Sequence, residues 1–193
     1  HAHTFVTCTS KTIKGMYFSN TALYSVAASA QNATSTGIFF LHVPTSATIN
    51  VRIRKIDVTI TNNVATLIDH DSAPRIAFSR ITHTDSWSGA TQAVAKRKTS
   101  DSANQANVRT ATTGTTVTLG NMWWSVIVPG LDITTAGMAS INFYCALNSL
   151  TEDEFIDLAP GEGLVAWQAD AGTTSDQRKA CLNIMWEEYD NVP

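Results

Sequence analysis

Asp69-His70-Asp71 has the residue types of a metal site or of an acid–base site. Because alternate residues of a strand share a face, Asp69 and Asp71 could hold one hard cation between them. The chain continues Ser72-Ala73-Pro74, and Asp, Ser and Pro are typical of turns, where short polar side chains hydrogen-bond the local backbone. The pattern therefore favours a turn over a metal site.

The sequence begins His1-Ala2-His3, which is a second arrangement that could bind a metal. If His1 is a mature N-terminus, its amine and imidazole and the imidazole of His3 could hold Cu(II), which suits nitrogen donors. Copper-dependent polysaccharide monooxygenases, which are β-sandwiches of similar size, resemble this chain at that first residue. The likeness ends there, because no nearby segment matches that family, and a start left by processing explains His1 equally well. A copper site at His1 and His3 is kept as a minor alternative.

Hydrolytic sites can be assembled from other side chains, but none has a recognisable local pattern. His70 and His83 could each be combined with a serine and an acid, yet no serine lies in a nucleophile-elbow sequence. The acids from Glu152 to Glu154 suit the start of a helical turn. Pro160-Gly161-Glu162-Gly163 is glycine-rich, but it precedes a strand, whereas a phosphate cradle precedes a helix. Pro at the second position and Gly at the third predict a type II turn within a structural hairpin. We therefore predict no enzyme, no cofactor and no catalytic residue.

Composition limits the partners of the chain. Its 193 residues carry a net charge of -3, and 15% of them are charged. A nucleic-acid packager needs a basic arm, whereas the main basic cluster here, Lys96-Arg97-Lys98, lies in a Ser- and Asn-rich segment that suits a solvated loop. No apolar run approaches the roughly 18 residues of a membrane helix. Three widely spaced cysteines, Cys8, Cys145 and Cys181, suit small buried residues better than a disulfide framework.

The strands that must position any site are indicated by period-two alternation. This pattern, with abundant threonine and little helical periodicity, predicts an all-β chain: an antiparallel β-sandwich or jelly roll with about 8–10 strands. The clearest strand covers 48–61, and its alternation slips at Arg54-Lys55, which predicts a β-bulge or a bend. Others are predicted at 75–82, 115–119, 139–147, 164–168 and 180–188.

Two segments, 37–43 and 122–128, are apolar on both faces. Such runs suit central strands covered on both sides or strands that meet another subunit. Trp123 and Trp124 are adjacent on one strand and should point to opposite faces, so that one faces a loop, a sugar or a partner. Our candidates for an interface with a partner are Trp123, Trp124, Trp87, Phe39 and Phe5.

The domain organisation is simple. We expect residues 1–20 to form an N-terminal arm or a first strand, and 21–190 to form a single β-sandwich. A loop at 85–109 exceeds the roughly 12–15 residues that are usual in compact domains, so it is a candidate for function or for ordering by a partner. One helical turn is expected at 149–155.

The last third of the chain resembles one group of proteins. The stretches LAPGEGLVAW (158–167), GTTSDQR (172–178) and LNIMWEE (182–188) are similar to the ends of structural proteins from tailed-phage virions. In that group a Pro-Gly-Glu-Gly turn precedes an apolar strand, a small-residue loop with an arginine, and a last strand that ends near Trp-x-Glu.

That resemblance implies a jelly-roll fold and a role as a capsid decoration (cement) protein or a head-fibre protein. It implies a homotrimer on the outer surface of the capsid, with the major capsid protein as its partner and with neither nucleic acid nor membrane. A receptor- or glycan-binding sandwich, such as a fibre tip, is the alternative of a different class.

Overall fold

The computed structural model describes residues 12–31, 33–34, 37–62, 68–69, 73–85, 90–110, 117–128, 132–133, 142–147, 156–172 and 178–190. These residues form strands and turns, with no helix among them. The strands are β1 (Ile13–Asn20), β2 (Tyr24–Ser25), β3 (Phe39–His42), β4 (Ile49–Asn62), β5 (Ile68–Asp69), β6 (Arg75–His83), β7 (Ala90–Thr91), β8 (Ala95–Lys96), β9 (Asn107–Thr110), β10 (Val117–Ile127), β11 (Asp132–Ile133), β12 (Asn142–Leu147), β13 (Ile156–Leu158), β14 (Glu162–Gln168) and β15 (Arg178–Asp190).

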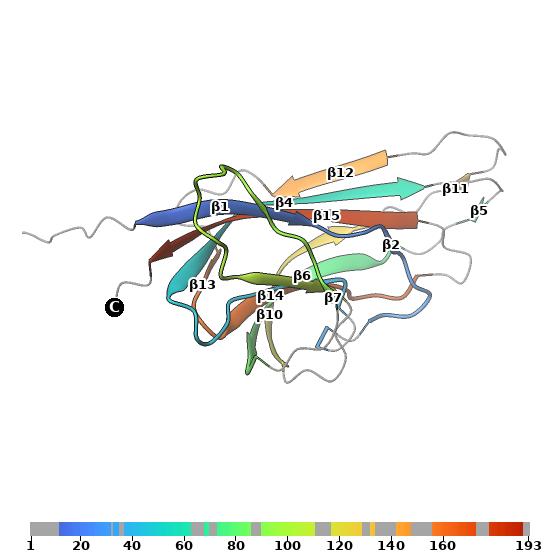
Figure 1. Ribbon diagram of the computed structural model, residues 1–193. Helices are drawn as coiled ribbons and strands as arrows, with labels where there is room; N and C mark the ends of the chain where they lie inside the picture. Colours follow the sequence, from blue (N-terminus) through green and yellow to red (C-terminus); the bar gives the residue numbers. More distant parts are fainter. Residues whose placement is uncertain are drawn as a thin grey trace, which may run out of the picture.

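Two antiparallel sheets pack face to face, as the sequence predicts (Figure 1). One has the order β12-β4-β15-β1-β8, with β13 also paired with β4 and β2 also paired with β15, and the other has the order β10-β6-β14-β3-β9-β7. The pairs β1/β15, β3/β14, β4/β12 and β6/β10 are nested along the chain, so the first strand pairs with the last. Nested pairs divided between two sheets are the connectivity of a jelly roll.

The bulge predicted at Arg54-Lys55 is confirmed. Along β4 and β15, Lys55 lies opposite Met185 and Ile53 lies opposite Trp186, so Arg54 is the extra residue of the bulge. The bulge shifts the alternation of side chains by one residue. The odd-numbered apolar residues before it and the even-numbered ones after it are therefore all buried: Ile49, Val51, Ile53, Ile56, Val58 and Ile60. One long strand can thereby keep its apolar side chains on the same core.

The main core lies between the two sheets. It combines side chains of β4, β15 and β1 with those of β3, β6 and β14, including Tyr17, Phe39, Phe78 and Trp186. Trp186 is fully buried, and its indole Nε1 donates to Glu188 at 3.3 Å. The alternating residues of 180–188 therefore form the core face that their period predicts.

The segment 37–43 is a central strand covered on both faces, as predicted. Phe39 and Leu41 of β3 face the main core, while Phe40 packs in a second cluster with Ile81 and Val165 on the outer face of the sheet. The segment 122–128 differs, because it belongs to β10, which is an edge strand that pairs with β6 alone among the described strands. The two strands predicted at 115–119 and 122–128 are one strand.

The Pro160-Gly161 turn is built as the sequence indicates. Glu162 N donates to Ala159 O at 2.9 Å, and Gly161 has a φ of 86°, which places Pro and Gly at the central positions of a type II turn. The turn does not close a hairpin, however. β13 pairs with β4 and β14 pairs with β3 and β6, so the turn is a corner at which the chain passes from one sheet to the other.

The long loop contains short strands where it is described. β7 pairs with β9 in one sheet, whereas β8, which lies between them along the chain, pairs with β1 in the other, so the segment 90–110 crosses to the other sheet and returns. Lys96, Arg97 and Lys98 are exposed, and Asp101 accepts the backbone N–H of Lys98 at 3.1 Å. This agrees with a solvated loop. In the part of the chain that the structure describes, no helix is long and apolar enough to cross a membrane.

Candidate functional site

Several residues that the sequence singled out lie outside the described part of the chain. These are His1, His3, Phe5, His70, Asp71, Trp87 and the acids of 152–154, and the helical turn expected at 149–155 lies there too. Asp69 ends the short strand β5, which pairs with β11. The copper and hydrolase alternatives built on these residues therefore stay as sequence-based hypotheses.

Trp123 and Trp124 do not point to opposite faces. The register between β10 and β6 slips here, because Met122 lies opposite Ser79 while Trp124 lies opposite Phe78, and Trp123 becomes the extra residue of a bulge. Both indoles pack against the main core, and the ring of Trp124 lies 5.0 Å from that of Phe78. The strict alternation assumed from the sequence fails at a bulge.

Phe39, the remaining interface candidate in the described residues, is a core residue. Its side chain is 2% exposed and belongs to the main cluster between the sheets. The apolar side chains that β10 does expose are Leu119, Met122 and Ile127, at 39%, 49% and 59%. The candidates for a partner surface therefore shift from the tryptophans to their neighbours on the same strand.

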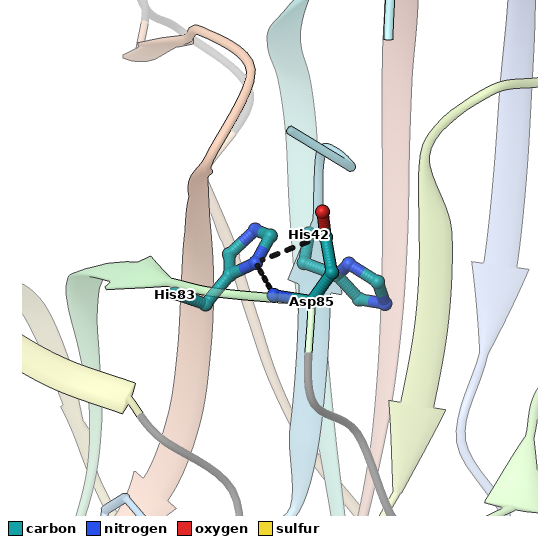
Figure 2. A group of neighbouring side chains, drawn as sticks. All are labelled: His42, His83 and Asp85. Carbon is teal, nitrogen blue, oxygen red and sulfur yellow. Dashed lines mark hydrogen bonds and ion pairs between the residues drawn. The ribbon is translucent and has the colours of Figure 1, made fainter. Parts of the chain in front are cut away.

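The structure brings together a group that sequence reasoning missed: His42, His83 and Asp85 (Figure 2). His42 is the last residue of β3, His83 is the last residue of β6, and Asp85 follows two residues later. One potential ligand atom from each residue can be chosen so that all three lie within 4.8 Å of one another. The two imidazole rings meet edge to face, with centroids 5.1 Å apart.

A glycine lies beside His42 on the strand between the two histidine strands. β14 lies between β3 and β6, so the histidine strands are second neighbours, about 9.6 Å apart. Gly163 of β14 lies opposite His42 on one side and Ile81 on the other. A Cβ at Gly163 would lie 2.5 Å from the carbonyl oxygen of Leu41 and 3.2 Å from the Cα of His42. Glycine at this position therefore allows β14 and β3 to lie close together next to His42.

Asp85 is held in place by the loop after β3. Its backbone has a φ of 60°, a left-handed conformation in which Asp is among the more frequent non-glycine residues. Its Oδ2 accepts the Thr45 N–H at 2.9 Å and also the Thr45 hydroxyl. Its Oδ1 faces Nδ1 of His83 at 3.3 Å. The carboxylate therefore joins the β3–β4 loop to the end of β6.

The orientation of His83 is fixed by its neighbours. Nδ1 accepts the backbone N–H of Asp85 at 3.2 Å, which assigns the ring proton to Nε2. The nearby backbone of Val43 and Glu162 partly opposes the lowering of the pKa of His83 by burial. The lone pair of Nδ1 is thus directed toward the side on which Asp85 lies.

The charges of the site follow from burial. Desolvation, with smaller contributions from His83 and Arg109, lowers the pKa of His42 to about 3, and desolvation also lowers the pKa of His83. Burial tends to raise the pKa of Asp85, but the hydrogen bonds from Thr45 outweigh it and lower that pKa. At neutral pH the site therefore has two neutral imidazoles and one carboxylate, which is a donor set for a divalent metal ion.

One signal for this site was present in the sequence. His83-Thr84-Asp85 places a histidine and an acid two residues apart at the end of a predicted strand. His42 lies in an apolar run, where its type alone gives no reason to pair it with residue 83. Only the strand order, with β14 between β3 and β6, connects the two.

A groove runs along the edge formed by β10 and β6. It encloses about 420 Å³ and is lined by Trp123, Met122, Arg80 and Glu162 among others. Arg80 donates to Glu162 at 3.3 Å and to the carbonyl of Asp157 at 2.6 Å. The groove thus has an apolar side from β10 and a charged pair on the other side.

Comparison of the sequence with family models and with curated proteins gives no match.

Proposed function

We propose that this chain is a structural protein of a phage virion, which decorates the outer surface of the capsid as a homotrimer. The resemblance of residues 158–188 to such proteins suggests the role. A jelly roll with a turn-rich surface and sparse charge is suited to binding across neighbouring subunits of a shell. The major capsid protein of the same virion is the proposed partner, and no enzymatic activity is part of the role.

The observation that supports the proposal most is the composition of the edge strand β10. Its eleven residues, VTLGNMWWSVI, include no charged side chain, and three large apolar residues on it are exposed. Monomeric proteins protect edge strands with charges, prolines or a covering segment, because an open edge pairs with other chains. We assign β10 to the contact between copies of this chain, in which its exposed apolar side chains would be covered.

Light scattering of the free protein over a range of concentrations tests this assignment. Wild type should have the mass of an oligomer, and Ile127→Lys or Met122→Lys should shift it toward the monomer. Leu23→Lys is the matched control, because Leu23 is as exposed as Ile127, at 59%, but lies outside β10. A wild-type monomer at all concentrations, without affinity for phage particles that lack the protein, would refute the proposal.

The groove beside β10 favours one alternative, a receptor- or glycan-binding sandwich. An aromatic side chain next to charged and amide groups, here Trp123 with Arg80 and Glu162, is suited to stacking on a sugar ring and hydrogen-bonding its hydroxyls. A glycan array with wild type and Trp123→Ala tests it. Retained binding in a variant that has lost oligomerisation would favour this alternative over capsid decoration.

A further inference from the structure

We propose that His42, His83 and Asp85 form a binding site for a first-row divalent transition metal ion, with Zn²⁺ as its typical occupant. Two imidazole nitrogens and one carboxylate oxygen are donors that Zn²⁺ accepts, and a water molecule would be the fourth ligand. This inference is independent of the proposed virion role.

The geometry of two of the ligands already fits. In a tetrahedral zinc site with bonds of about 2.0–2.1 Å, two ligand atoms lie about 3.3 Å apart. Nδ1 of His83 and Oδ1 of Asp85 are 3.3 Å apart. The largest separation within the group is at most 4.8 Å, so His42 has to approach by no more than about 1.5 Å. Nδ1 of His83 has one lone pair, which accepts the backbone N–H of Asp85 at 3.2 Å, so a bound ion would take the place of that hydrogen bond.

The surroundings of the ligands match those of metal sites. A metal-binding histidine usually donates its second N–H to a carbonyl or a carboxylate, which fixes the ring. Carboxylate ligands are held in the same way, and the N–H and hydroxyl of Thr45 both hydrogen-bond the distal oxygen of Asp85. The support leaves Nδ1 of His83 and Oδ1 of Asp85 on the same side.

Access to the site is from one direction. The side chain of His83 is fully buried and His42 is 2% exposed, whereas the side chain of Asp85 is 33% exposed. An ion would therefore enter at Asp85, and its water ligand would face solvent there. The bound ion would add a link between the end of β6 and the end of β3, which are not neighbours in the sheet.

The types of ligand make the site selective. Two of its three ligand atoms are imidazole nitrogens and only one residue supplies carboxylate oxygen, so affinity has to come mainly from nitrogen–metal bonds. Ca²⁺ and Mg²⁺ prefer several oxygen ligands, so they should not bind, whereas Zn²⁺ and Co²⁺ should.

Titration calorimetry of the whole chain, stripped with a chelator, is the first test. We expect about one Zn²⁺ per chain at this site and no heat with Ca²⁺ or Mg²⁺. Because binding to the native state alone stabilises it, free Zn²⁺ at about 100 times the dissociation constant should raise Tm by about 5–10 °C. Absence of zinc binding would overturn the proposal.

Variants locate the ion. Asp85→Asn should lower zinc affinity at least about tenfold, and it should fold, because Asn also adopts left-handed backbone and keeps an oxygen for Thr45. His42→Gln should lower the affinity as well. Asp101→Asn is the control for the loss of an acid elsewhere, and His3→Ala is the control for a site at the start of the chain. Loss of binding in His3→Ala with full binding in Asp85→Asn would overturn the proposal.

The visible spectrum of bound Co²⁺ gives a readout that does not depend on stability. Wild type should show the ligand-field bands of a four- or five-coordinate ion, and Asp85→Asn should lose or shift them while Asp101→Asn retains them. Identical spectra in these proteins would place the ion elsewhere and refute the assignment.

Discussion

Arg54 donates from Nη2 to both carboxylate oxygens of Glu187, at 2.7 and 2.6 Å, across the bulge of β4. The side chain of Glu187 is only 4% exposed, whereas that of Arg54 is 25% exposed. Because Arg54 is the extra residue of the bulge, its side chain can reach a carboxylate that the regular ladder would pair with Arg52. The bulge therefore stabilises a nearly buried charge.

Removal of Arg54 should be strongly destabilising. Arg54→Ala leaves the carboxylate of Glu187 buried without this ion pair, and losing one partner of a buried pair costs about 3–5 kcal/mol. Urea unfolding should show this loss in the free energy of unfolding. Arg75→Ala is the matched control, since Arg75 and Asp170 form a similar pair with both side chains 41% exposed, and solvent-exposed pairs of this kind contribute little to stability. Equal losses in the two variants would contradict the argument.

Glu188 should make stability depend on pH. Its carboxylate is 1% exposed, and burial raises its pKa although Gln105 N–H, Ala106 N–H and the Trp186 indole donate to it. The folded-state pKa therefore lies above the unfolded value, so its contribution to stability is complete below the unfolded pKa and is lost as pH rises through the folded pKa. The free energy of unfolding of wild type should fall relative to Glu188→Gln across that range.

The Glu188 comparison needs denaturant unfolding of both proteins at several pH values from about 4 to 8, the range around the usual pKa of a glutamate. Gln keeps one oxygen as an acceptor for Ala106 N–H but does not titrate. A wild-type curve that rises with pH relative to the variant would show that the hydrogen bonds outweigh burial.

Gly161 of the corner turn and Gly163 of β14 should differ in their tolerance of side chains. Gly161 has a φ of 86°, so Gly161→Ala should cost about 1–2 kcal/mol, and Gly161→Asn should cost less because Asn adopts this conformation more readily. At Gly163 the obstacle is the carbonyl of Leu41, 2.5 Å from an added Cβ. Gly163→Ala should therefore cost about 1–3 kcal/mol through overpacking, and Gly163→Asn should be no better. Thermal unfolding measures all four variants, and a rescue by Asn at 163 would contradict this distinction.

The buried polar side chain of Gln168 should contribute to the stability of the fold. Its side chain is 1% exposed, and its oxygen accepts from Tyr24 OH and Ala27 N while its amide donates to Ala27 O and Asp170 O. Gln168→Leu would leave the part-buried N–H of Ala27 without this partner, whereas the Ala27 carbonyl keeps the N–H of Gly172. A buried group left unsatisfied costs about 1–3 kcal/mol. Gln92→Leu is the control, because the Gln92 side chain donates one bond, to Thr110, at 3.2 Å. Urea unfolding should rank Gln168→Leu as clearly less stable.

Much of the fold could be predicted because the alternation of apolar and polar residues along a strand reflects which of its faces is buried. The segment 48–61 indicated both its strand and its bulge, since an extra residue is the usual reason for apolar side chains to change phase within one strand. The prediction that Trp123 and Trp124 point to opposite faces failed for a related reason. A bulge within a run of apolar residues does not change the alternation of apolar and polar residues, so the sequence gives no sign of it. In the same way, the Pro-Gly turn specified its own backbone, whereas the sheet to which each flanking strand belongs depends on distant partners.

By itself the sequence determined the all-β class, the bulge at Arg54-Lys55 and the type II turn at Pro160-Gly161, because each depends on residues that are close along the chain. The tertiary structure alone decided that His42 meets His83 and Asp85. That contact depends on the placement of β14, which begins more than a hundred residues after His42, between β3 and β6. Contacts of this kind follow from the order of strands in a sheet, which no local pattern encodes.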